Sequence, residues 1–158
     1  MNNTAVKSIQ QEQRLIIDSI NKALRLKSHP DSLSGQAKHI DYEISALLPI
    51  LDNKIEFCKN ILADLTVLAA KSQAQSARLA SFLAKLKNYM LGKLFYLSLK
   101  ENQYLLIKDF SSRGNKNFLL GAVAMIEASQ ENSMLFLDTL TEQRQKDFFI
   151  GMISCIYN

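Results

Sequence analysis

At 158 residues the chain has the length of one domain and can bury a substantial core. A hydrophobic fraction of 47% and a charged fraction of 22% exclude a wholly disordered protein, and only 5 Gly and 2 Pro argue against an all-β fold, which needs frequent turns. The net charge is +4, and the composition as a whole predicts a single all-α domain over residues 1–158.

The N-terminal part carries two helical patterns. Apolar residues at helical spacing predict a first helix over Thr4–Lys27. The residue before a proline avoids helical dihedral angles, so the His29-Pro30 step should end this helix and residues 28–35 should form a loop. A shorter helix is expected over 36–48.

The longest regular pattern runs from Leu51 to Leu97, where apolar positions alternate in steps of four and three residues. A single helix of this length would extend about 75 Å. A domain of this size has a radius of gyration of only roughly 15 Å. We therefore expect a reversal in the small polar run 72–76, which gives helices over 50–72 and 75–99. The uninterrupted heptad phase keeps one long helix as the alternative.

The residues that follow are less regular. Apolar runs on both sides of 100–103 allow a short β-hairpin over 94–110, but a lone hairpin is marginal and we favour helical packing of the same residues. Residues 111–116 form the clearest loop in the chain, because they combine Gly with Ser, Asn and charged side chains.

Two further helices are expected after this loop. Residues 118–129 are apolar on nearly all sides, which predicts a buried helix. Asn132 or Ser133 can cap a last helix over 133–156. The first helix, the two halves of the central stretch and the last helix have matched lengths. We therefore predict an all-α fold, an antiparallel bundle of four main helices plus one or two short helices.

The sequence offers no set of metal ligands. His29 and His39 stand ten residues apart with a proline between them, and neither has an acidic or Cys partner at a ligand spacing. Glu127 and Glu131 share one helix face, where solvated carboxylates are the simpler interpretation. We predict that no metal is bound.

An activated nucleophile is also missing. Cys58 and Cys155 lie within apolar helical patterns, where burial makes a thiol inert. Asp41 and Glu43, near His39, are interpreted as a surface cluster. The sequence contains no nucleophile elbow, no phosphate-binding glycine loop and no dinucleotide fingerprint. We therefore predict that the protein is not an enzyme and uses no cofactor.

Nothing in the sequence predicts export or membrane insertion. The first residues lack the charged and then apolar order of a secretory signal. The longest apolar run, Phe118–Ile126, is too short to span a bilayer. A cytoplasmic protein is the resulting expectation.

The positive charge is concentrated in residues 65–100, which hold six Lys or Arg and no Asp or Glu. Lys71, Arg78 and Lys85 are spaced by seven and would share one face of an unbroken helix, with Lys87 nearby. Such a stripe can stay solvated, bind an acidic protein or follow a nucleic-acid backbone. The sequence shows no helix-turn-helix and no interleaved aromatics that would support the last option.

An apolar surplus accompanies these charges. Residues 57–100 carry more large apolar side chains, Phe82 and Phe95 among them, than a two-helix contact needs. This indicates a groove, a dimer face or burial on two sides. Residues 82–97 would also suit a helix on anionic lipid. Lys93 is the one charge on the apolar seam, where it would snorkel or mark the end of the bundle.

The sequence thus favours a non-enzymatic protein-binding module: an adaptor, a secretion-type chaperone or an inhibitor that holds another polypeptide, which could be acidic. The alternatives are a nucleic-acid-associated regulator that uses the basic stripe of residues 71–100, and a protein that lies on a membrane surface. A homodimer stays open. The predicted partner-binding residues are Lys71, Arg78, Lys85, Lys87, Phe82 and Phe95.

Overall fold

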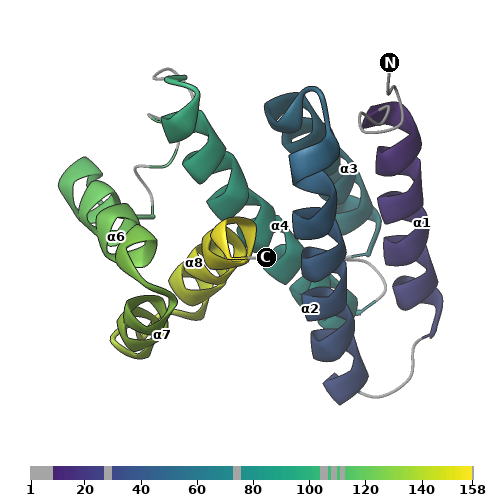
Figure 1. The fold of residues 1–158 in the computed structure, drawn as a ribbon. Helices are drawn as coiled ribbons and strands as arrows, with labels where there is room; N and C mark the ends of the chain where they lie inside the picture. The colour runs from purple at the N-terminus through teal and green to yellow at the C-terminus, as the bar shows by residue number, and fades with distance from the viewer. Residues whose placement is uncertain are drawn as a thin grey trace.

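The fold is given by a computed structural model, which describes residues 9–26, 30–72, 76–103, 107, 110 and 113–157. Within these residues the chain forms seven α-helices, one short 3-10 helix and no β-strand (Figure 1). The α-helices are α1 (Ile9–Leu26), α2 (Pro30–Leu47), α3 (Lys54–Ser72), α4 (Ala77–Lys100), α6 (Lys116–Ala128), α7 (Gln130–Asp138) and α8 (Gln143–Ile156), and the 3-10 helix η1 covers Leu48–Ile50. The all-α prediction is confirmed. The arrangement of four main helices is not, because the helices are more numerous and less even in length.

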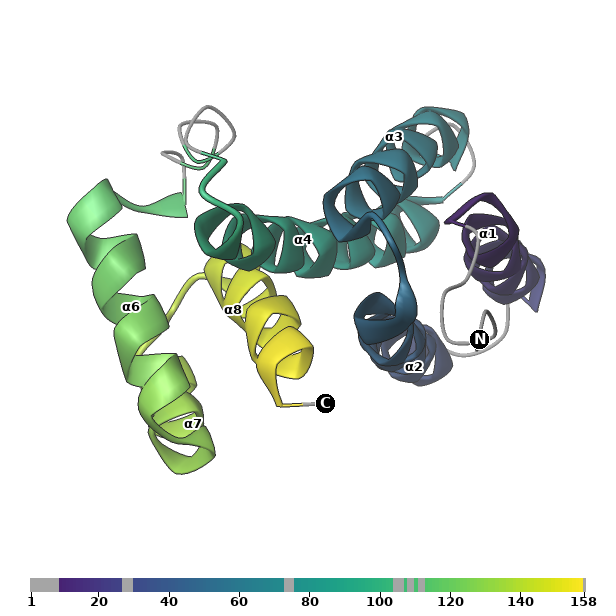
Figure 2. The same ribbon diagram turned by 45° about the horizontal axis from the view of Figure 1, so that its top comes forward.

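Helix α4 is the element against which the others are arranged. It packs against α2, α3 and α8. α1 packs against α2 and α3, and α7 packs against both α6 and α8. Figure 2 shows the result: α1 lies at one edge of the molecule and α6 at the other, with α2, α4 and α8 between them.

The central stretch reverses where the sequence predicts. α3 ends at Ser72 and α4 begins at Ala77, and the two helices pack against each other. Ser76 caps α4, because its side chain accepts a hydrogen bond from the backbone N–H of Arg78 at 3.2 Å. The alternative of one long helix is therefore wrong, although the apolar seam stays buried on both sides of the turn.

The crossing of α4 and α8 brings two backbones together. A Cβ atom at Gly92 would lie 1.8 Å from the carbonyl oxygen of Phe148, and one at Gly151 would lie 2.0 Å from that of Tyr89. Cβ atoms in real proteins essentially never approach a neighbour within 3.0 Å. Only glycine fits at both positions, so this pair sets the distance between α4 and α8.

α2 begins earlier than predicted. α1 confirms the first predicted helix, of which residues 4–8 and 27 lie outside the described part of the chain. α2 starts at Pro30, so the loop expected over 28–35 is wrong from residue 30 onward. A proline is tolerated in the first turn of a helix, where its missing N–H has no partner. The buried stripe of α2 begins correspondingly early, with Leu33, Ala37, Ile40 and Ile44.

The stretch after α4 does not follow the hairpin alternative. Residues 94–100 form the last turns of α4, so the first arm of a hairpin is excluded. Residues 104–106, 108–109 and 111–112 lie outside the described residues. α6 then confirms the helix predicted over 118–129, but it is buried on one face only, since Leu120 and Met125 are exposed.

The last predicted helix, over 133–156, is two helices. Ser129 caps α7 by accepting a hydrogen bond from the backbone N–H of Asn132 at 3.0 Å. α7 ends where the hydroxyl of Thr139 donates to the carbonyl of Phe136 at 2.7 Å. α8 starts only at Gln143. The break lets α7 turn away and leaves a space between α7, α8 and α2.

Candidate functional site

The residues of the predicted basic stripe do not share one face. Lys71 is exposed in the last turn of α3, whereas Arg78 and Lys87 are exposed on α4. The shared face assumed one continuous helix, and the turn between α3 and α4 removes it. On α4, Lys87 lies about half a turn away from Arg78. The exposed cations are therefore spread over two helices.

Lys85 forms an ion pair within the protein. Its Nζ lies 2.9 Å from Oδ1 of Asp147, a residue of α8 that is buried. The side chain of Gln143 donates to the same oxygen at 2.9 Å. Lys85 also stands 5.6 Å from the ring centroid of Tyr89, whose pKa is raised by its own burial and then by Asp147. This ion pair joins α4 to α8 and leaves Lys85 little freedom to bind a partner.

The two aromatic residues of the predicted site lie in the core. Phe82 and Phe95 are 4% and 0% exposed. The Phe95 ring packs 5.2 Å from that of Phe110 and 5.8 Å from that of Phe148, centroid to centroid. Both side chains belong to the buried core, so neither ring is available at the surface.

Lys93 forms the centre of a buried polar network. It is 0% exposed, and its Nζ donates to the carbonyl of Gly151 at 2.8 Å and to the hydroxyl of Ser154 at 2.7 Å. The same Nζ lies 2.5 Å from Oδ1 of Asp41. Ser154 in turn donates to Oδ2 of Asp41 at 2.7 Å and lies 2.7 Å from the hydroxyl of Ser45.

This network corrects two predictions. Lys93 neither snorkels nor marks the end of the bundle, because α2 and α8 close over it and supply its acceptors. Asp41 is buried rather than part of a surface cluster; only the other two members, His39 and Glu43, pair near the surface, at 3.2 Å. The sequence does signal the charge on the seam, but not its partner.

The geometry of the network favours a stabilising role for Lys93 and Ser154 over a catalytic one. The Nζ of Lys93 makes two hydrogen bonds, to the Gly151 carbonyl and the Ser154 hydroxyl, and an ion pair with Asp41, so its polar contacts are all with α2 and α8. A buried ion pair of this kind is costly to desolvate but still costlier to break. Its role is to hold α2, α4 and α8 in register.

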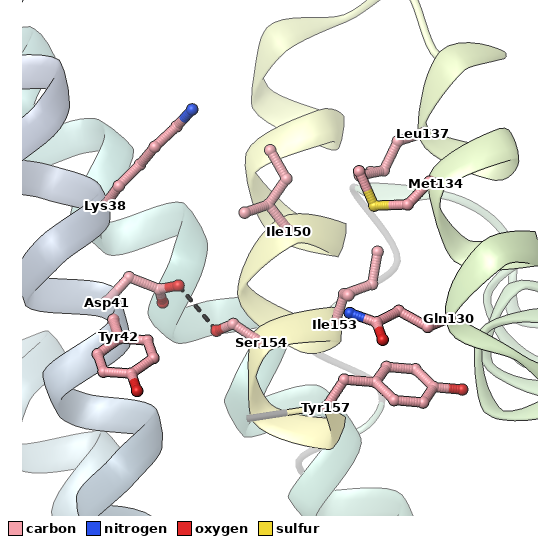
Figure 3. Close-up of a pocket in the computed structure, with 10 residues that line it drawn as sticks. All are labelled: Lys38, Asp41, Tyr42, Gln130, Met134, Leu137, Ile150, Ile153, Ser154 and Tyr157. Atoms are coloured by element: carbon pink, nitrogen blue, oxygen red, sulfur yellow. Dashed lines mark hydrogen bonds between the residues drawn. The ribbon is translucent and has the colours of Figure 1, made fainter.

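Above this network lies a groove between α2, α7 and α8, with a volume of about 410 Å³ (Figure 3). Ile150, Ile153 and Ser154 of α8 form its floor, and α7 supplies one wall. Figure 3 shows Lys38 and Ile150 towards one end and Tyr42 and Tyr157 towards the other. The remaining lining residues are Asp41 of α2 and Gln130, Met134 and Leu137 of α7.

The groove is apolar and its rims are exposed. Met134 is 54% exposed and Tyr42 is 62% exposed, which is high for large side chains. Asp41 is the one carboxylate among the lining residues, and Lys93 neutralises it from below. An open apolar groove with an adaptable methionine and an exposed tyrosine on its rims is typical of surfaces that bind other molecules.

The other candidate chemistries find little support in the described residues. Burial raises the pKa of the Cys58 thiol to about 12 and also raises that of Cys155, so both thiols stay protonated. Within the described part of the chain no cluster of His, Cys, Asp or Glu could hold a metal ion. None of the described helices is long and apolar enough to cross a bilayer.

Comparison with known proteins assigns no family: no family model matches the chain, and neither a curated protein nor a solved structure matches it significantly. The groove therefore has to be interpreted from its own residues. The sequence did not identify it, because its walls come from α2, α7 and α8 and depend on the break between the last two helices.

Proposed function

We propose that the protein is a non-enzymatic binding module that holds a segment of another polypeptide in the groove between α2, α7 and α8. The observation that carries the proposal is the exposed apolar lining of this groove, above all Met134 on its rim and Ile150 on its floor. The binding surface proposed from the sequence, over residues 57–100, thereby moves to another face of the molecule.

The shape of the groove suits a helical or extended segment with a few large apolar side chains. Helices commonly bind in grooves between other helices, with anchors spaced by three or four residues. The floor is rigid, because the glycine crossing and the Lys93 network fix α8 against α4 and α2. A preformed, rigid floor lowers the entropic cost of binding. The methionine on the rim can adapt to the side chains of the partner.

The two alternatives find less support. The apolar residues that a membrane-surface helix over 82–97 would need, such as Leu83, Leu86 and Met90, are buried. The basic stripe that a nucleic-acid regulator would use is divided between two helices, and Lys85 pairs with Asp147. Lys71, Arg78 and Lys87 remain exposed and serve as a test of that alternative.

The test is selection of binders from a displayed library of random peptides, followed by affinity measurement with purified variants. Met134→Glu places a charge in the groove, and Val67→Glu makes the same change at an equally exposed apolar residue of α3, since both side chains are 54% exposed. We expect Met134→Glu to weaken the selected peptides by about tenfold or more, as for an interface hot spot, and Val67→Glu to leave them unchanged.

Circular dichroism of each variant serves as the control that its helical fold is intact. Peptides that bind Met134→Glu as tightly as the natural protein would contradict the proposal. Binding that is instead lost in the combined variant Lys71→Glu, Arg78→Glu and Lys87→Glu, and that weakens steeply with salt, would move the site to the basic residues.

A further inference from the structure

The two rims of the groove carry opposite charge. Lys38 lies on the α2 side, lines the groove and is exposed. On α7, Glu131 and Asp138 are exposed. None of these three side chains has an ion-pair or hydrogen-bond partner among the residues that the structure describes. They are free to interact with a bound molecule.

Helical geometry places both acids at the outer edge of the α7 wall. Gln130, Met134 and Leu137 face the groove. With 3.6 residues per turn, Asp138 follows Met134 by about 40° around the helix and Glu131 by about 60°, on the side away from the buried residues. The α7 rim is therefore acidic.

The carboxylate of Asp41, which also lines the groove, does not remove the charge difference between the two rims. Asp41 is the lining carboxylate on the α2 side, but it is almost completely buried and paired with Lys93. Among the α2 side chains that the structure describes, Lys38 is thus the charged lining residue without a partner, and a bound segment meets this lysine on one side and the acids of α7 on the other.

We infer that the occupant of the groove is an amphipathic helix with acidic side chains along one edge of its apolar stripe and basic side chains along the other edge. The acidic edge faces Lys38, and the basic edge faces Glu131 and Asp138. Flanking charges select partners and orientation in the same way in coiled coils, where they add specificity more than affinity. This inference rests on the proposed groove function and specifies its partner.

The experiment uses four synthetic helical peptides of about 14 residues, roughly four turns. All share one apolar stripe, and their two edges carry Glu and Lys, Glu and Glu, Lys and Lys, or Gln and Gln. Turning a helix end for end exchanges its two edges in space. The mixed peptide can therefore satisfy both rims in one direction, whereas the two singly charged peptides cannot do so in either direction.

Binding to the natural protein is measured by fluorescence anisotropy at low and high salt. We expect the mixed peptide to bind at least about fivefold more tightly than the Glu–Glu and Lys–Lys peptides at low salt, and the difference to shrink at high salt, as for exposed charge pairs. In the Lys38→Glu variant both rims are acidic, so the Lys–Lys peptide should become the tightest binder. Lys71→Glu, with the same change of net charge at an exposed site on α3, should keep the original order.

The outcomes separate the inference from the function on which it rests. Equal affinities for all four peptides, or an order that Lys38→Glu does not change, would overturn the charged-edge inference and leave the apolar groove intact. If no peptide binds the natural protein, or if Met134→Glu affects none of them, the groove function itself is refuted.

Discussion

Replacing Gly151 by alanine should destabilise the protein, although alanine is the better helix former. By propensity alone, Gly→Ala within a helix stabilises by about 1 kcal/mol. At Gly151, however, the new Cβ would lie 2.0 Å from the carbonyl oxygen of Tyr89, more than an ångström short of the 3.4 Å at which ordinary contact begins. α4 and α8 would have to separate, and overpacking of this kind costs about 1–3 kcal/mol or more.

Gly121 of α6 provides the matched control. A Cβ atom there meets nothing within 4 Å, so Gly121→Ala should show the favourable propensity alone and stabilise by about 0.4–1 kcal/mol. Thermal or urea unfolding measures both variants, and 1 kcal/mol corresponds to a shift in Tm of about 2–4 °C for a chain of this size. A Gly151→Ala variant as stable as the natural protein would refute the close crossing of α4 and α8.

Three further changes test the contacts that hold the fold. Lys93→Met leaves Asp41 buried and unpaired, so it should cost about 3–5 kcal/mol in urea unfolding, and adding Asp41→Leu should recover part of that loss; no recovery would argue against the ion pair. Lys100 lowers the pKa of Glu127 by its ion pair at 2.6 Å, so this contribution to stability is present at neutral pH and is lost as the pH falls through the lowered pKa of the carboxyl group. This loss of stability at low pH should be small because the ion pair is exposed. In the Lys100→Met variant, the contribution of the ion pair to the pH dependence of Tm should be absent. Ser129→Ala removes the N-cap of α7 and should cost about 1 kcal/mol by the same unfolding assay, whereas no change would show that this cap contributes nothing.

The sequence predicts which segments are helical better than it predicts the residues at which the helices begin and end. Periodicity identifies α1, α3 and α4, and a continuous apolar run identifies α6. The reversal between α3 and α4 follows from comparing the length of a single helix with the size of the domain. The start of α2 is misjudged because Pro30 can end one helix or open the next, and local residues do not decide between them. The break between α7 and α8 contains neither Gly nor Pro, so composition does not signal it.

The candidate site is harder to predict, because it depends on contacts between distant segments. Lys93 is recognisable as a charge on an apolar seam, but Asp41, its partner, lies on another helix and resembles a surface residue in the sequence. Phe82 and Phe95 look like surplus apolar surface until α8 is placed over α4. The groove forms only because α7 and α8 are separate helices, so no local pattern in the sequence predicts it.

The most direct test of the proposed groove is NMR of the protein labelled at its methionine methyl groups during titration with the mixed Glu–Lys peptide. Met134 lines the groove, whereas Met125 of α6 has a similar exposure, 45% against 54%, and lies outside the groove lining. We expect the Met134 signal to shift to saturation while the Met125 signal stays in place. A shift at Met125 with Met134 unchanged, or no shift at either methyl group, would contradict the proposed groove.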